Sequence, residues 1–109
     1  MIVKTQFGKI KEILVEKYSP ENELISRACL IIRERPDNQG KMAMLEDVWT
    51  NEKYRNQGFA SEILKNVIEI AKKENVYKIV LQCKTSLVDW YAKFGWNTHQ
   101  NAMRLDING

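Results

Sequence analysis

The chain has 109 residues, 44% of them hydrophobic and 28% charged, which indicates one globular domain with a modest core. Its 17 Lys and Arg against 14 Asp and Glu leave a net charge of +3, too small and too evenly spread to indicate a nucleic-acid-binding protein, although it favours an anionic ligand. The N-terminus lacks the apolar segment of a signal peptide, and no apolar run approaches about 20 residues, so we expect a cytoplasmic protein without a membrane span.

The N-terminal part of the chain is only partly decided by its pattern. Residues 2–7 predict a short strand. Residues 9–18 fit either a helical stripe or an exposed strand, and the pattern leaves that choice open. Residues 19–22, which include Pro20, predict a turn.

Two longer strands and a hairpin follow. Residues 24–35 place apolar side chains on both faces, which predicts a strand in the middle of a sheet. Residues 36–40 carry Pro, Asp, Asn and Gly and predict a hairpin loop. Residues 42–50 are then the return strand.

The helix predicted over residues 58–74 has the clearest pattern. One apolar stripe at helical spacing consists of Ile63, Leu64, Val67, Ile68 and Ala71. The strand predicted next, residues 77–83, contains a continuous apolar run that suits burial on both faces. The order strand, helix, strand implies a parallel pair with a right-handed crossover.

The C-terminal part predicts one more helix and one more strand. Residues 86–89 resemble a capping box with Asp89 in the acidic position, so a short helix is expected to start at Ser86 and to stop at Gly95. Alternating apolar residues over 103–107 predict a last strand. The whole chain therefore predicts an α/β fold, with a sheet of mixed strand direction and helices packed on it.

The cysteines suggest neither a disulfide nor a metal site. Cys29 and Cys83 lie far apart in apolar, strand-like runs and have no metal-type spacing with His99. We expect two reduced, buried cysteines and no bound metal.

The segment that opens the long helix indicates a ligand. Residues 54–61 place a basic residue, Arg55, three positions before Gly58, and a small residue, Ala60, follows two positions later. Helix N-termini carry unpaired N–H groups and the positive end of the helix dipole, so a turn of this kind suits a phosphate. The sequence therefore predicts a phosphorylated ligand.

With its neighbours, this turn resembles the GNAT superfamily of N-acetyltransferases. The family's phosphate turn is matched by Arg55-Asn56-Gln57-Gly58-Phe59-Ala60. The likeness to the glucosamine-6-phosphate N-acetyltransferases extends over residues 45–48, 54–55, 77–81, Cys83 and residues 90–96. The resemblance implies acetyl-CoA as the donor and a single domain over residues 1–109, in which residues 1–25 form an abbreviated N-terminal part. It also implies a mixed, mostly antiparallel sheet with a central parallel pair and flanking helices.

The resemblance also implies roles for individual residues. Glu46 would be the general base or hold a water, Tyr91 would protonate the departing thiolate, and Asp47 and Gln82 would contact the acceptor. Neighbouring residues of a regular strand face opposite sides, so only one of Glu46 and Asp47 would face the cleft unless a bulge intervenes. The implied cofactor-binding residues are Val48, Trp49, Thr50, Arg55, Asn56, Gln57, Gly58, Phe59, Ala60 and Ser61.

Three positions depart from the family pattern around the acceptor. Gln82 stands where these relatives carry Asp, Leu87 where they carry an Asn that contacts the cofactor, and Trp49 where they carry a smaller apolar residue. The expected acceptor is therefore a primary amine of open identity: an amino-sugar phosphate such as glucosamine 6-phosphate, or a protein lysine or N-terminal amine. A CoA-binding module without catalysis is the third alternative. A homodimer, in which a second subunit completes the acceptor site, would fit the shortened N-terminal part.

Overall fold

The structure is a computed structural model that describes residues 1–5, 8–37 and 39–108. Within these residues one sheet has the strand order β1-β2-β3-β4. Its strands, with the helix that joins the last two and a short second helix, are β1 (Ile10–Tyr18), β2 (Leu24–Glu34), β3 (Lys41–Thr50), α1 (Phe59–Lys73), β4 (Val76–Leu81) and α2 (Val88–Ala92). Two short 3₁₀ helices, η1 (Glu52–Tyr54) and η2 (Thr85–Leu87), precede α1 and α2.

The sheet has mixed strand direction, as predicted. β1, β2 and β3 pair antiparallel, while β3 and β4 pair parallel through the α1 crossover. The sequence left residues 9–18 open between a helix and a strand. The structure has a strand there, because β1 pairs with β2 along its whole length. The parallel pair lies at one edge of the described sheet rather than at its centre.

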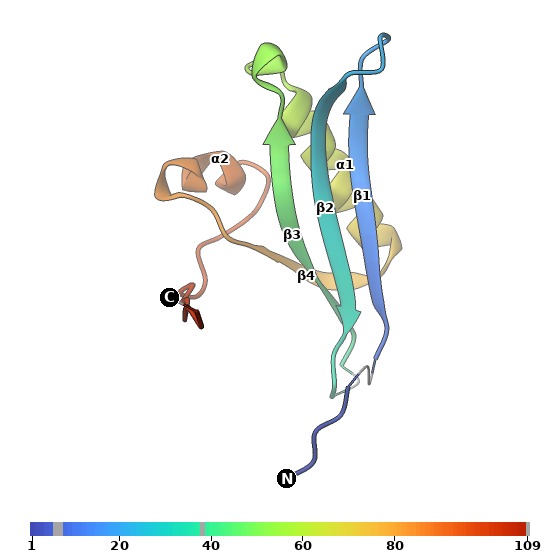
Figure 1. Ribbon diagram of the computed structural model, residues 1–109, viewed down its shortest axis with the longest axis vertical. Helices are drawn as coiled ribbons and strands as arrows, with labels where there is room; N and C mark the ends of the chain where they lie inside the picture. Colours follow the sequence, from blue (N-terminus) through green and yellow to red (C-terminus); the bar gives the residue numbers. More distant parts are fainter. Residues whose placement is uncertain (6–7, 38, 109) are drawn as a thin grey trace.

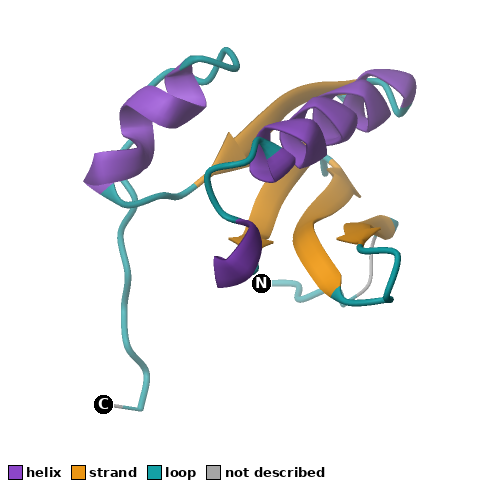
Figure 2. Ribbon diagram, turned by 90° about the horizontal axis from the view of Figure 1, so that it is seen from above, coloured by secondary structure: helices purple, strands orange, loops and turns teal. Residues whose placement is uncertain are grey.

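The core lies between α1 and one face of the sheet, as Figure 2 shows. Leu30 of β2 and Leu64 and Val67 of α1 belong to this core, and all three are fully buried. The predicted stripe of α1 supplies its buried residues, and Lys72 and Lys73 lie in the last turn, where the helix dipole favours them. Burial of this stripe, rather than helix propensity, is what stabilises α1.

No helix of the described residues covers the opposite face of the sheet (Figure 2). Apolar side chains on this face stay partly exposed, including Leu14 of β1 at 56% and Met44 of β3 at 41%. This face of the sheet is therefore partly accessible to solvent.

Two predicted strands are absent from the described residues. Residues 2–5 form no strand, and the remainder of that prediction, Gln6 and Phe7, lies outside the described residues. The strand predicted over residues 103–107 was also wrong: that segment lies apart from the sheet in Figure 1, and Met103, Leu105 and Ile107 are at least 80% exposed. Alternation alone does not form a strand, because the backbone also needs a pairing partner.

The capping box and the burial of the second cysteine were wrong as well. η2 occupies Thr85–Leu87, α2 starts at Val88, and no side chain caps either helix. β4 ends at Leu81, so Cys83 lies beyond the strand and is exposed, while Cys29 is half-buried. Both cysteines are free thiols in the structure.

Candidate active site

A bulge in β3 shapes the centre of the candidate site. Arg27 pairs with Trp49, but Cys29 pairs with Glu46, so β3 carries one extra residue opposite β2. Asp47 sits in this extra stretch with φ 54°, a left-handed conformation that is uncommon outside glycine. Bulges re-aim side chains and disrupt the local hydrogen-bond ladder.

Because of the bulge, Glu46 and Asp47 line the same cavity rather than opposite faces of the sheet. Both are exposed, and they stand where β3 and β4 separate, since the parallel pairing ends at Leu45 and Leu81. The sequence left this point conditional on a bulge, and the structure contains one. Two carboxylates at the mouth of one cavity suit a role as a proton acceptor and as a ligand for a cationic amine.

The cavity has a volume of about 990 Å³ and lies between the diverging ends of β3 and β4. α2 and residues 95–102 close its other side. Gln82 and Tyr91 also line it, so the structure brings together the four residues predicted for catalysis and acceptor binding: Glu46, Asp47, Gln82 and Tyr91.

Tyr91 belongs both to this cavity and to the core. It is 7% exposed, and its ring packs edge-on against Trp96 with centroids 5.9 Å apart. Burial raises the pKa of the Tyr91 hydroxyl above its usual value, and the nearby Cys83 thiol adds to the shift. The phenol therefore stays protonated well above neutral pH, as a proton donor must.

The Tyr91 ring is held in place by its surroundings. Trp96 fixes this region to the sheet, because its indole Nε1 donates to the Ile79 carbonyl of β4 at 3.0 Å. Trp90 stacks edge-on with Phe94 at 5.2 Å between centroids. The Trp96 contact was not predicted, because it joins residues 17 positions apart in the chain.

Past the far end of β3 and η1 lies the predicted anion-binding turn, residues 55–61. Gly58 is the N-cap of α1 with φ 84°, no side chain caps the helix, and the first helical hydrogen bond runs from the Glu62 N–H to the Gly58 carbonyl. The N–H groups of Phe59, Ala60 and Ser61 therefore precede the helical ladder. Asn56 also has a positive φ, 63°, and left-handed residues of this kind curve the backbone into anion-binding concavities.

The structure adds one point about Gly58 itself. A Cβ built there would meet nothing within 4 Å, so the protein interior does not require glycine at this position. The positive φ does favour it, because side chains destabilise the left-handed region. Arg55 leads into the turn and donates from Nε to the Thr50 carbonyl at 3.1 Å.

The turn and the cavity are separate features joined by β3. None of the residues 55–61 lines the cavity, and neither do Val48, Trp49 and Thr50. Those three residues form the last part of β3 and lead from Asp47 to the turn through η1, as Figure 1 shows. Beyond Leu45 no described residue pairs with β3 on the side of β4, so an extended ligand has an open strand edge there.

The residues that brace the turn were missed by the sequence analysis. Asn51, at the end of β3, caps η1 by accepting from the Lys53 N–H at 3.1 Å, and Lys53 forms an ion pair with Glu23 at 2.8 Å. An Asn such as Asn51 can form a turn by accepting a hydrogen bond from the N–H two residues later, but this signal is weak. Nothing in the sequence connects Lys53 with Glu23.

Within the described part of the chain, no group of three or more His, Cys, Asp or Glu side chains is arranged to hold a metal ion. No helix described in the structure is both long and apolar enough to span a membrane.

Comparisons with known proteins agree with this arrangement. Residues 9–96 match the model of the acetyltransferase (GNAT) family. The chain is 26% identical over 91 residues to a glucosamine 6-phosphate N-acetyltransferase of Trypanosoma brucei brucei, covering 83% of this chain and 62% of that protein. It is 32% identical over 79 residues to a probable glucosamine 6-phosphate N-acetyltransferase 2 of Oryza sativa subsp. japonica, covering 72% of this chain and 48% of that protein.

A comparison with a solved acetyltransferase structure supports the same fold. The crystal structure of a Trypanosoma brucei acetyltransferase superposes with a TM-score of 0.78 at 26% identity, covering 86% of this chain and 69% of that one. This chain thus spans about half to three fifths of the length of the two curated relatives named above. The family model covers most of the chain, and the mixed sheet with its open strand edge and helix N-terminal turn has the family's fold: the chain belongs to the acetyltransferase (GNAT) family.

Proposed function

We propose that this protein is an acetyl-CoA-dependent N-acetyltransferase that transfers acetyl directly to a primary amine. The observation that carries this proposal is the position of two features at and beyond β3. One strand presents two carboxylates at a bulge beside the cavity and leads through η1 to the start of α1, which no side chain caps. A donor with a pyrophosphate at one end and a reactive thioester at the other matches these two features.

The donor would lie along β3. Its pyrophosphate accepts hydrogen bonds from backbone N–H groups of Gln57–Ser61, supported by the α1 dipole. Its pantetheine amides pair with the open edge of Val48–Thr50, as an added strand would. A backbone N–H freed by the bulge near Val48 can donate to the thioester oxygen and stabilise the oxyanion.

The reaction is an acyl transfer in three steps. Glu46, directly or through a water, takes a proton from the acceptor ammonium, and the amine nitrogen then attacks the thioester carbon. The tetrahedral intermediate collapses, the C–S bond breaks, and the thiolate takes a proton from the Tyr91 hydroxyl. The nitrogen gives up its second proton through water, which restores the Tyr91 phenol and leaves a neutral amide. Asp47 and Gln82 contact the acceptor; Gln82 can accept a hydrogen bond from the amine but carries no charge.

For the acceptor we propose an amino-sugar phosphate such as glucosamine 6-phosphate. Support comes from the names of the two curated relatives and from the carboxylates at the cavity mouth. A protein lysine or N-terminal amine is the second candidate, because one face of the sheet is open and a polypeptide acceptor brings its own surface. A homodimer that completes the acceptor site would be supported by the exposed apolar residues of the C-terminal segment, Met103, Leu105 and Ile107.

Thiol release from acetyl-CoA tests this proposal, measured against glucosamine 6-phosphate, a polyamine and a lysine peptide. Turnover with the sugar phosphate alone supports the first acceptor, and turnover with the peptide alone supports the second. Tight binding of acetyl-CoA without turnover on any amine would contradict the enzymatic proposal and leave a CoA-binding module.

A further inference from the structure

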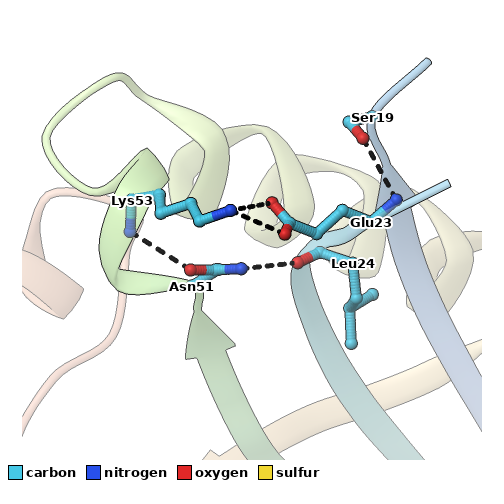
Figure 3. A network of polar contacts seen from close by, with 5 residues as sticks. All are labelled: Ser19, Glu23, Leu24, Asn51 and Lys53. Atoms are coloured by element: carbon cyan, nitrogen blue, oxygen red, sulfur yellow. Dashed lines mark hydrogen bonds and ion pairs between the residues drawn. The ribbon is translucent and has the colours of Figure 1, made fainter. Parts of the chain in front are cut away.

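We propose that Asn51, Lys53 and Glu23 are positioning residues for the donor: they hold the anion-binding turn in the shape that binds pyrophosphate, without touching the ligand. This inference rests on the proposed function. All three lie outside the cavity, and Figure 3 shows them joined in one polar network at the end of β3.

Asn51 joins the end of β3 to β2 and η1. Its backbone N–H donates to the Ile25 carbonyl at 2.8 Å, and its side-chain Nδ2 donates to the Leu24 carbonyl at 3.3 Å. On the other side, its Oδ1 accepts from the Lys53 N–H at 3.1 Å and its carbonyl accepts from the Tyr54 N–H at 2.9 Å. The backbone and the side chain of Asn51 together therefore set the direction in which the chain leaves the sheet.

Lys53 and Glu23 make a second connection. The Lys53 ammonium donates to both carboxylate oxygens of Glu23, at 3.1 and 2.8 Å. Glu23 is itself fixed, because its backbone N–H donates to the Ser19 hydroxyl at 3.1 Å and its carbonyl accepts from the Ser19 N–H at 2.8 Å. The pair thus connects η1 to the turn between β1 and β2.

This ion pair is too exposed to contribute much to global stability. The side chains of Lys53 and Glu23 are 68% and 38% exposed, and pairs of that kind stabilise folded proteins only slightly. The Lys53 ammonium is also committed to Glu23, so it is not arranged as a direct phosphate ligand. What the pair constrains is the local path of the chain.

That path leads into the turn within a few residues. The Arg55 N–H donates to the Glu52 carbonyl at 3.4 Å, and the Gln57 side chain donates to the Lys53 carbonyl at 3.5 Å. Backbone N–H donors bind an anion more tightly when they are already oriented, because little conformational entropy is then lost on binding. Loosening Asn51 or Lys53 should therefore weaken pyrophosphate binding specifically.

The test compares two donors. Acetyl-CoA carries the pyrophosphate, whereas S-acetylpantetheine lacks it, and both dissociation constants are measured by NMR titration. Asn51→Ala and Lys53→Met should each weaken acetyl-CoA binding about three- to tenfold, the loss expected for one or two hydrogen bonds, and should leave S-acetylpantetheine binding unchanged. Lys53→Arg, which keeps the charge and the reach, should restore most of the affinity.

Matched controls are available on the exposed side of α1. Asn66→Ala removes a side-chain bond to the Glu62 carbonyl, and Lys72→Met removes an exposed ion pair with Glu69. Neither should change the affinity for either donor. Amide hydrogen exchange in the ligand-free protein should be faster over residues 55–61 in Asn51→Ala than in Asn66→Ala.

Three outcomes would overturn the inference. Equal weakening of both donors would mean a general structural defect, and unchanged acetyl-CoA affinity in Asn51→Ala and Lys53→Met would mean that the network does not shape the turn. In either case wild-type binding of acetyl-CoA leaves the proposed function intact. A wild-type protein that binds neither donor would overturn both.

Discussion

Replacements of Gly58 separate its role in the fold from its role in binding. Gly58 has φ 84°, and a Cβ there would meet nothing within 4 Å. Gly58→Ala should therefore lower the free energy of unfolding only through the strain of the left-handed backbone, by about 1 kcal/mol. That loss lowers the Tm of a domain of this size by about 5 °C. It should bind acetyl-CoA nearly as well as the wild type.

Gly58→Asp should behave in the opposite way. Asp tolerates the left-handed region better than Ala, and its charge interacts favourably with the N-terminus of α1, so stability should stay within about 0.5 kcal/mol of the wild type. A carboxylate about 6 Å from a phosphate at an effective dielectric of about 20 costs about 3 kcal/mol, which weakens acetyl-CoA binding about 100-fold.

Calorimetric titration measures the acetyl-CoA affinity of both variants, and thermal unfolding measures their stability. Gly58→Ala should lose stability but keep its affinity, and Gly58→Asp should do the opposite. Gly40→Asp is a matched control, because Gly40 also has a positive φ, 101°, but precedes β3 at the end of the sheet away from the turn. It should lose stability and keep its acetyl-CoA affinity. If Gly58→Ala and Gly58→Asp bind acetyl-CoA equally well, the turn is not the phosphate site and the reasoning fails.

Three further predictions concern the reaction and the acid stability. Tyr91→Phe should lower kcat at least tenfold with little change in acetyl-CoA affinity, since only thiolate protonation is lost; an unchanged kcat would leave Tyr91 a core residue only. Glu46→Gln should lower kcat, whereas Asp47→Asn should mainly raise the KM of the amine; steady-state kinetics showing the reverse pattern would exchange the two roles. The Lys53 ammonium lowers the pKa of the Glu23 carboxyl below its usual value of 4.5, so the pair stabilises the fold above pH 4.5 and this contribution is lost as the pH falls through the lower folded value. Thermal unfolding between about pH 3 and 6 should therefore show a slightly smaller acid loss in Glu23→Gln than in the wild type, because an exposed pair contributes little; identical profiles would mean that the pair has no effect on stability.

The elements with strong local signals were predictable. α1 has its apolar residues on one face at helical spacing, and Gly58 marks its start, so both the helix and the turn followed from sequence. The β2–β3 hairpin and the parallel β3–β4 pair followed from the strand patterns and the crossover rule.

What the sequence left open depends on partners distant in the chain. β1 is a strand because it pairs with β2, although its own pattern also fits a helix. The segment that contains Met103, Leu105 and Ile107 alternates as a strand should, yet it has no pairing partner among the described residues. Exposure of Cys83 follows from the early end of β4, which its apolar run does not mark.

The candidate site also combines features with a local sequence signal and features that depend on distant residues. Gly58 and its flanking residues were recognisable because a glycine at a helix start has a local cause. The bulge at Asp47 has no Gly or Pro to mark it and exists only through the pairing of β3 with β2. The brace of Asn51, Lys53 and Glu23 likewise joins two turns about 30 residues apart, and only the three-dimensional structure reveals it.

Amide chemical shifts during an acetyl-CoA titration test the central claim most directly, because they report on the turn and the bulge in one experiment. We predict that the largest changes fall on the backbone N–H groups of residues 57–61 and of Val48, with downfield shifts at the turn as the pyrophosphate accepts their hydrogen bonds. Shifts confined to the open face of the sheet around Leu14, or none at millimolar acetyl-CoA, would contradict the account.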